Sequence, residues 1–131
     1  MKDKHVFIID DDPQVTSVLS KLFSDKGAQV TTVATLAAAK EGLKASMPDI
    51  VIVDVLLPDG SGLDLIKEES ARQGAHPFFV VLTNSVNAQH IAEAMTAKVP
   101  MFVQKADNDP REIVEMIQKR LERGEKPNTT S

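Results

Sequence analysis

The chain has 131 residues, of which 42% are hydrophobic and 26% charged, and its net charge is −4 at pH 7. A chain of this length can bury a sizeable core in one domain, and its mildly acidic balance provides no basic surface for direct binding of nucleic acid. It has no cysteine, which excludes disulfides, thiol chemistry and cysteine-ligated zinc.

Membrane and export signals are lacking as well. The longest apolar runs, at residues 50–53 and 78–82, are far shorter than the roughly 18 residues needed to cross a bilayer. The N-terminal stretch "MKDKHVFII" has no long apolar segment and no small-residue cleavage site, so it does not read as a signal peptide. We therefore expect a cytoplasmic protein without a membrane span.

Five short apolar runs predict five β-strands. They lie at residues 5–9, 29–33, 50–53, 78–82 and 101–103. Three of these runs are rich in Val and Ile without polar alternation. That pattern is typical of strands covered on both faces, as in a parallel sheet.

Segments with helical spacing of apolar residues alternate with these strands. In the first, Asp12 is a good N-cap, Pro13 a good first helical residue and Gly27 a good stop. Further helices are expected at about 35–46, 62–73 and 86–97, and a fifth opens within 107–112. Five alternations predict an α/β fold with one parallel sheet, right-handed crossovers and helices on both faces.

One domain accounts for this pattern. We expect it to span residues 1–122, followed by a polar stretch at 123–131 that is either a tail or the start of a linker. The sequence contains no internal repeat and no low-complexity tract.

Polar residues collect where the predicted strands end, and ligands of open α/β sheets bind beyond the carboxyl ends of the strands. These residues are Asp10, Asp11 and Asp12 after the first strand, Asp54 after the third, Thr83 after the fourth and Lys105 after the fifth. Each has an ordinary structural role available, as a helix cap, a strand end or a solvated charge. Together they indicate a site.

The combination favours phosphoryl chemistry. Clustered carboxylates need a counter-charge, and Mg²⁺ is a hard cation that one or two carboxylates can hold. A transferring phosphoryl group needs cationic and hydrogen-bonding partners, which Lys105 and Thr83 supply. A carboxylate can itself be the nucleophile and form an acyl phosphate.

Four motifs in order carry a family resemblance: "IIDDDP", "IVIVDVLLPDGSGLDLI", "VVLTNS" and "FVQKAD". Over roughly residues 4–122 the chain resembles the receiver (CheY-like) domain of two-component response regulators. The resemblance implies a flavodoxin-like, doubly wound (βα)5 fold with strand order 2-1-3-4-5. It also implies a signalling switch rather than an enzyme, with at most self-catalysed phosphotransfer and autodephosphorylation.

The resemblance also implies roles for particular residues. Asp54 is the expected phosphoacceptor, and Asp10 and Asp11 are the acidic pair that holds Mg²⁺ together with Asp54. Asp11 is expected to contact the metal directly and Asp10 through water. The backbone carbonyl of Leu56 is expected to be a further metal ligand.

Two further residues complete the expected switch. Thr83 is the hydroxyl that hydrogen-bonds the phosphoryl group, while Lys105 neutralises its charge. Phe102 falls where the family keeps its switch aromatic. The expected phosphate donor is a histidine kinase or a histidine phosphotransfer protein. Output is expected through a protein target that binds the fourth helix, fifth strand and fifth helix, with the chain a monomer or a phosphorylation-linked dimer.

The sequence departs from the family at several of these positions. Ala106 follows the lysine where proline is usual, so a cis bond is not assumed, because a non-proline cis bond costs about 2.5–4 kcal/mol. Asn84 stands where a small residue is usual, and we expect it either to crowd the site or to hydrogen-bond within it. Leu56 and Ser85 occupy positions that often hold the hydrolytic water, which predicts a long-lived phosphorylated state.

Other readings remain open. A degenerate receiver would bind partners without phosphorylation. An aspartate-nucleophile phosphohydrolase of the haloacid dehalogenase type would use Asp10 and Asp12, but Gln14 stands where that motif has Thr or Val. A flavin carrier on the same architecture is disfavoured, because three aspartates would repel the flavin phosphate.

Overall fold

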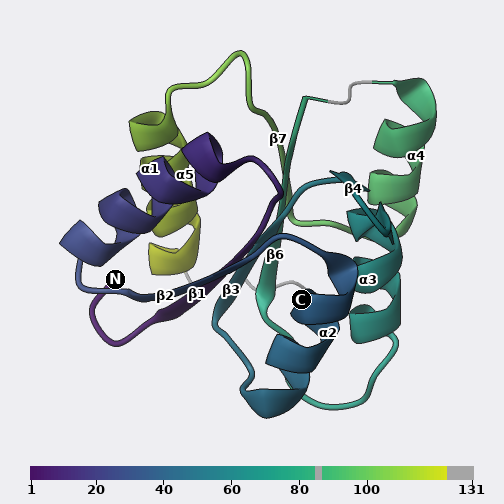
Figure 1. Cartoon of the computed structure of the whole chain (residues 1–131), viewed down its shortest axis with the longest axis horizontal. Helices are drawn as coiled ribbons and strands as arrows, with labels where there is room; N and C mark the ends of the chain where they lie inside the picture. The colour runs from purple at the N-terminus through teal and green to yellow at the C-terminus, as the bar shows by residue number, and fades with distance from the viewer. Residues whose placement is uncertain (85–86, 124–131) are drawn as a thin grey trace.

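Five parallel strands form the central layer of the structure, a computed structural model that describes residues 1–84 and 87–123 (Figure 1). The strands are β1 (His5–Ile9), β2 (Gln29–Val33), β3 (Ile50–Val53), β6 (Phe78–Thr83) and β7 (Met101–Gln104). Their order is β2-β1-β3-β6-β7. This confirms the predicted flavodoxin-like topology, in which the five main strands are arranged 2-1-3-4-5.

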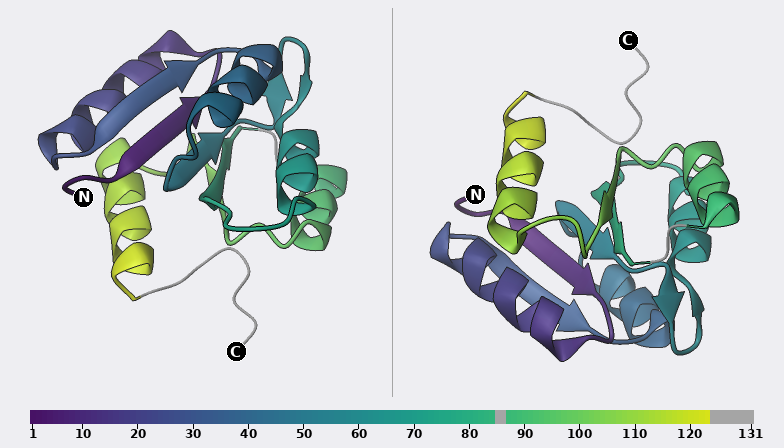
Figure 2. Two further views of the ribbon diagram at one scale, coloured as in Figure 1. Left: turned by 90° about the horizontal axis from the view of Figure 1, so that it is seen from below. Right: turned by 90° about the horizontal axis from the view of Figure 1, so that it is seen from above.

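Helices cover both faces of this sheet (Figure 2). One face carries α1 (Pro13–Asp25) and α5 (Pro110–Glu122), and the other carries α2 (Leu36–Ala45), α3 (Gly62–Ser70) and α4 (Ala88–Thr96). Within the described residues, none of the helices combines the length and apolar character that crossing a membrane requires.

The two-sided burial explains why the strands lack polar alternation. Val6 and Ile8 of β1 pack into the core beneath α1 and α5, whereas Phe7 and Ile9 pack beneath α2 and α3. All four residues of β3 are buried. Successive side chains point to opposite faces of a sheet, so a strand with an apolar layer on each face must be apolar throughout.

The capping residues predict where the helices begin and end more accurately than the spacing of apolar residues does. Asp12 caps α1 by accepting from the amide of Gln14, and Gly27 adopts a φ of +90° just beyond that helix, as expected from the sequence. The expected extension of α3 to residue 73 is wrong, because the helix ends at Ser70. Similarly, α4 begins at Ala88, with Asn87 as its cap, rather than at residue 86.

Two strands run one residue further than predicted. β6 ends at Thr83 and β7 at Gln104, and these two residues are partners in the parallel register. Thr83 is therefore held by the sheet itself. Its position at the sheet edge follows from strand pairing and not from a loop.

A small hairpin after β3 was not anticipated. β4 (Leu56–Leu57) pairs antiparallel with β5 (Gly60–Ser61), and α3 starts directly afterwards. At its turn, the carboxylate of Asp59 accepts from the amides of Leu36 and Ala37, at 2.8 and 3.0 Å. These two bonds lower the pKa of Asp59. They tie the segment after β3 to the start of α2.

Candidate functional site

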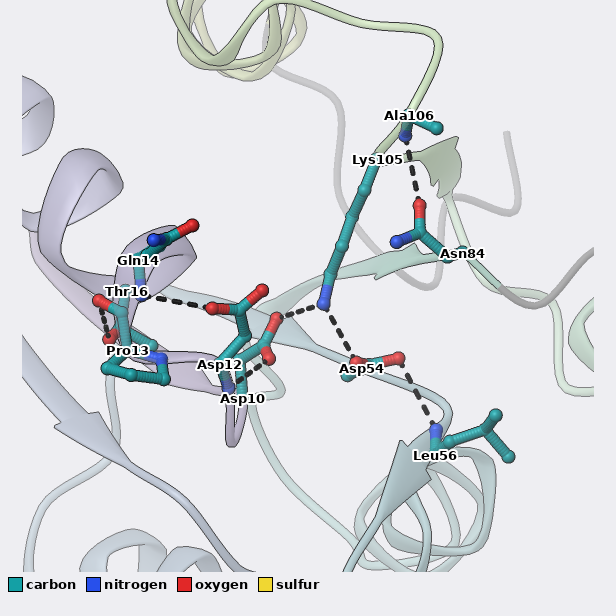
Figure 3. Close-up of polar contacts among 10 residues, drawn as sticks. All are labelled: Asp10, Asp12, Pro13, Gln14, Thr16, Asp54, Leu56, Asn84, Lys105 and Ala106. Carbon is teal, nitrogen blue, oxygen red and sulfur yellow. Dashed lines mark hydrogen bonds and ion pairs between the residues drawn. The ribbon is translucent and has the colours of Figure 1, made fainter.

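The carboxyl edge of the sheet brings together Asp10, Asp54 and Lys105 (Figure 3). Nζ of Lys105 lies 2.7 Å from Oδ2 of Asp10 and 2.9 Å from Oδ2 of Asp54. Asp10 follows β1, Asp54 follows β3 and Lys105 follows β7, so three different strands deliver these groups. One ammonium thus bridges two carboxylates, as the position of these residues at the strand ends predicts.

Asp10 is a buried carboxylate whose charge is costly. Its side chain is 3% exposed, and burial raises the pKa of Asp10. The hydrogen bond from Lys105 and the bond from the amide of Asp12, at 2.9 Å, oppose this shift without cancelling it. These two bonds therefore do not fully compensate the burial of the Asp10 carboxylate, and a further positive charge beside it would be favourable.

Lys105 is held in its charged form. Burial is the largest single influence and lowers the pKa of Lys105, but the bonds to Asp10 and Asp54 together outweigh it and leave that pKa raised. The backbone amide of Lys105 donates to the carbonyl of Thr83 at 3.0 Å. No peptide bond in residues 1–84 and 87–123 is cis, so the bond to Ala106 is trans, and Lys105 still points at the carboxylates.

Asp54 is fixed on both of its oxygens. Oδ2 meets Lys105, and Oδ1 accepts from the amide of Leu56 at 3.3 Å. Its backbone is fixed too, since a Cβ added at Gly62 would overlap the carbonyl oxygen of Asp54 and lie 2.6 Å from a methyl group of Val53. The first turn of α3 therefore packs directly on the peptide group of this aspartate.

Three carboxylates converge closely enough to hold a metal ion. Asp10, Asp11 and Asp54 each offer a ligand atom, and these atoms lie within 4.8 Å of one another. Carboxylate oxygens are the ligands that hard divalent cations such as Mg²⁺ prefer, so the donor set fits that ion. Asp11 is exposed and faces solvent, whereas Asp12 is engaged as the cap of α1.

Thr83 and Phe102 lie on the two adjacent strands of this edge. Thr83 is buried at 1% exposure, and Phe102 is half-buried against the core beneath α2, α3 and α4. Phe102 is the register partner of Val81, two residues before Thr83 on β6. The structure thus places the expected switch pair on neighbouring strands.

The other residues singled out in the sequence differ in their surroundings. The side chain of Leu56 points outward and is 58% exposed. Ser85 lies outside the described residues. Asn84 was expected to crowd the site or to hydrogen-bond within it. Its Oδ1 accepts from the amide of Ala106, the residue after Lys105, at 3.0 Å (Figure 3). A non-proline residue at 106 was the signal for this bond, because it keeps its N–H.

Asp59 is a residue that the sequence analysis missed. The segment "PDGSG" carries the residues of a turn, and an aspartate beside a glycine turn is a common backbone acceptor. Its partners in α2 are 23 and 22 residues away, so no local pattern identifies them.

Comparisons with known proteins agree with this geometry. The family model described as the response regulator receiver domain matches residues 6–118. A response regulator of Staphylococcus epidermidis named SaeR is 32% identical over 126 residues, which cover 95% of this chain and 53% of that protein. The chain therefore spans about half the length of the curated relatives it matches.

Solved structures show the same fold. A CheY-like receiver domain protein from Methanospirillum hungatei superposes with a TM-score of 0.83 at 20% identity, covering 93% of this chain and 96% of that one. A putative response regulator from Chloroflexus aurantiacus has a TM-score of 0.76 at 26% identity, with coverage of 92% and 98%. The matched family model, the sheet order and the acidic edge together lead to one conclusion: this chain belongs to the response regulator receiver domain family.

Proposed function

We propose that Asp54 is the residue on which this receiver domain accepts a phosphoryl group. The observation that carries the proposal is the environment of its carboxylate, which lies between the ammonium of Lys105 and the amide of Leu56 beside two further acids. A fixed cation and a fixed amide are the partners that the charge of a transferring phosphoryl group requires.

The transfer itself needs one nucleophile. A carboxylate oxygen of Asp54 attacks phosphorus and forms a new oxygen–phosphorus bond. The bond between phosphorus and the donor's leaving atom breaks, and the leaving group keeps its electron pair. Lys105 stays protonated throughout and offsets the charge on the phosphoryl oxygens, which its raised pKa favours.

Mg²⁺ is the cofactor that fits this site. When bound, it would supply positive charge to the phosphoryl oxygens. Asp10, Asp11 and Asp54 would hold it with their carboxylates, and the backbone carbonyl of Leu56 is a further proposed ligand. Receiver domains typically use this ion, and the chain's own contribution is the convergence of three acids at one sheet edge.

Output is proposed to pass through Thr83 and Phe102. The Thr83 hydroxyl would bond the phosphoryl group, and Phe102 would move inward from its half-buried position. The change would alter the surface of α4, β7 and α5, where a protein target binds. The proposed phosphate donor is a histidine kinase or a histidine phosphotransfer protein, and the proposed setting is the cytoplasm.

Several aspects of organisation are proposals as well. Residues 1–122 are proposed as the functional unit, with 123–131 as a tail or the start of a linker, of which 124–131 lie outside the described residues. The chain is proposed to act as a monomer or as a dimer formed on phosphorylation, without binding nucleic acid directly.

Intact mass spectrometry after incubation with acetyl phosphate tests the acceptor. With Mg²⁺ the wild-type chain is expected to gain one phosphoryl group, and without a divalent cation it is expected to gain none. Asp54→Asn should remain unmodified. Asp64→Asn is the matched control, since it changes an exposed aspartate of α3 and should be modified like wild type.

Two results would redirect the proposal. An unmodified wild type would favour an interaction module that works without phosphorylation. Continuous release of inorganic phosphate in excess of the protein, without an accumulated adduct, would instead favour a phosphohydrolase.

A further inference from the structure

The side chain of Asn84 ties the loop after β7 to the end of β6, just beyond the last paired residues of the two strands. The last paired residues are Thr83 and Gln104, and the amide of Lys105 then donates to the carbonyl of Thr83 at 3.0 Å. The next amide along the chain, that of Ala106, donates to Oδ1 of Asn84, also at 3.0 Å. The side chain of Asn84 thus holds the residue after Lys105 at a point where the paired strands have already ended.

The hydrogen bond to Asn84 holds the peptide group that joins Lys105 to Ala106. Together with the bond from Lys105 to Thr83, it places a hydrogen bond on each side of the Lys105 α-carbon. The ammonium of Lys105 sits at the far end of a four-carbon stem, so a rotation of the backbone at 105 changes the direction from which the stem approaches the two carboxylates. Nζ lies 2.7 Å from Asp10 and 2.9 Å from Asp54, so it must keep this direction to serve both carboxylates.

A second side chain holds the other part of the same loop. Nδ2 of Asn108 donates to the carbonyl of Gln104 at 2.8 Å, and this bond closes the loop on itself. Asn84 acts differently, because it joins the loop to β6, the strand that carries Thr83. The bond from Asn84 therefore sets the loop relative to the sheet, whereas the bond from Asn108 sets its internal shape.

We propose that Asn84 is a positioning residue for phosphoryl transfer, which holds the Lys105–Ala106 peptide group against the end of β6 and so directs the ammonium at Asp54. The inference rests on the proposed function of Asp54 and Lys105 and adds a residue that touches neither. Asn84 is exposed, so its replacement by alanine creates no buried cavity.

The test is a double-mutant cycle on the rate of phosphorylation by acetyl phosphate, with saturating Mg²⁺ and the full chain. Asn84→Ala removes the acceptor, and Ala106→Pro removes the donor, because proline has no N–H. In the wild-type background, Asn84→Ala should lower the maximal rate about two- to fivefold, the scale of one exposed neutral hydrogen bond. In the Ala106→Pro background, the same Asn84→Ala change should have no further effect.

Asn87→Ala is the matched control. Asn87 also accepts from a backbone amide, that of His90 at 2.8 Å, but it caps α4 and does not touch the loop of Lys105. This variant should lose some stability and keep the wild-type rate. For Asn84→Ala, the concentration of acetyl phosphate that gives half the maximal rate and the Kd for Mg²⁺ should both stay as in wild type. A general loosening of the site would change them.

The ¹⁵N signal of the Lys105 ammonium, recorded without a phosphate donor, separates this inference from the proposed function. Asn84→Ala should shift that signal and speed hydrogen exchange at the amide of Ala106. An unchanged signal, or equal rate losses for Asn84→Ala in both backgrounds, would overturn the inference. If wild type is never phosphorylated, the proposed function fails, and the ammonium signal still decides whether Asn84 positions Lys105.

Discussion

Lys105 and Asp10 form the shorter of the two ion pairs at the sheet edge, with Nζ 2.7 Å from Oδ2. The same ammonium serves Asp54 at 2.9 Å. One positive charge therefore serves two buried carboxylates, and Asp10 remains costly to ionise. Two negative charges with one positive partner favour the binding of a second cation. The same imbalance makes the free energy of unfolding of the metal-free protein depend on pH through the raised pKa of Asp10.

Asp10→Asn is expected to stabilise the metal-free protein at neutral pH. The folded-state pKa of Asp10 is raised, so folding favours the protonated form, and this contribution to stability is fully present below the unfolded pKa of about 3.8. That contribution is lost as pH rises through the raised folded value. Asparagine stays neutral, and Lys105 keeps Asp54 as its partner. Denaturant titrations in EDTA between about pH 3 and pH 8 measure the effect.

The advantage of Asp10→Asn should grow as pH rises through this window and vanish at its acidic end. Asp11→Asn is the control, because Asp11 is exposed and makes no contact of this kind with Lys105 in the described structure. A variant that is less stable than wild type at every pH would show that the ion pair outweighs the burial of Asp10.

The binding of Mg²⁺ is expected to depend on the side chain of Asp11 and not on that of Asp12. At one hundred times its Kd, a ligand of the folded state adds about 2.7 kcal/mol to the free energy of unfolding. Asp11→Ala should lose most of this gain. Asp12→Ala should keep it, although loss of the cap on α1 lowers the starting stability by about 0.5–2 kcal/mol.

NMR titration with Mg²⁺ gives the two affinities directly, since the chain has no tryptophan to report binding by fluorescence. Equal weakening of Mg²⁺ binding in the Asp11 and Asp12 variants would contradict the assignment of Asp12 as a cap alone.

Thr83→Ala is expected to accept the phosphoryl group and fail to switch. The hydroxyl of Thr83 is the proposed bond to the new phosphoryl oxygens, and its differential affinity for the phosphorylated state drives the population shift. Amide spectra recorded with acetyl phosphate and Mg²⁺ should show large shifts around Phe102 in wild type and small ones in the variant. Thr31→Ala, on the edge strand β2, serves as the control and should switch fully.

Leu56→Asn is expected to shorten the life of the phosphorylated state. The outward side chain of Leu56 offers no hydrogen bond to an attacking water, whereas an amide there would hold one. A tenfold faster decay corresponds to about 1.4 kcal/mol of barrier, within reach of one positioned hydrogen bond. Decay is followed by intact mass at fixed Mg²⁺ after the donor is removed.

Met47→Asn is the matched control for this decay experiment. It makes a similar apolar-to-amide change at a residue that is 49% exposed in the connection between α2 and β3. The control should decay as wild type does, and identical decay in all three proteins would rule out water positioning at Leu56.

Much of this architecture was predictable because burial on two faces leaves a plain signal. The strand β3 is apolar at every position, and α1 carries both its cap and its proline in the sequence. The parallel topology then places Asp10, Asp54 and Lys105 at one edge without further information. Those predictions rest on local rules and on one rule of sheet geometry.

Long-range hydrogen bonds between a side chain and the backbone were not predictable. The partners of Asp59 lie in α2, and the partner of Asn84 lies 22 residues further along the chain. Neither pairing leaves a periodic pattern. The end of α3 at Ser70 was missed for a different, local reason, because Ala71, Arg72 and Gln73 after it fit a helix and a loop equally well.

Position 62 requires glycine for a reason that lies outside its own helix. Replacing a helical glycine by alanine ordinarily stabilises a helix by about 1 kcal/mol. Here the added methyl group would collide with the carbonyl oxygen of Asp54, a backbone atom that cannot yield without moving the aspartate. The first residue of α3 thus affects the site through its shape alone, and replacing it should displace Asp54 although Gly62 contributes no functional group.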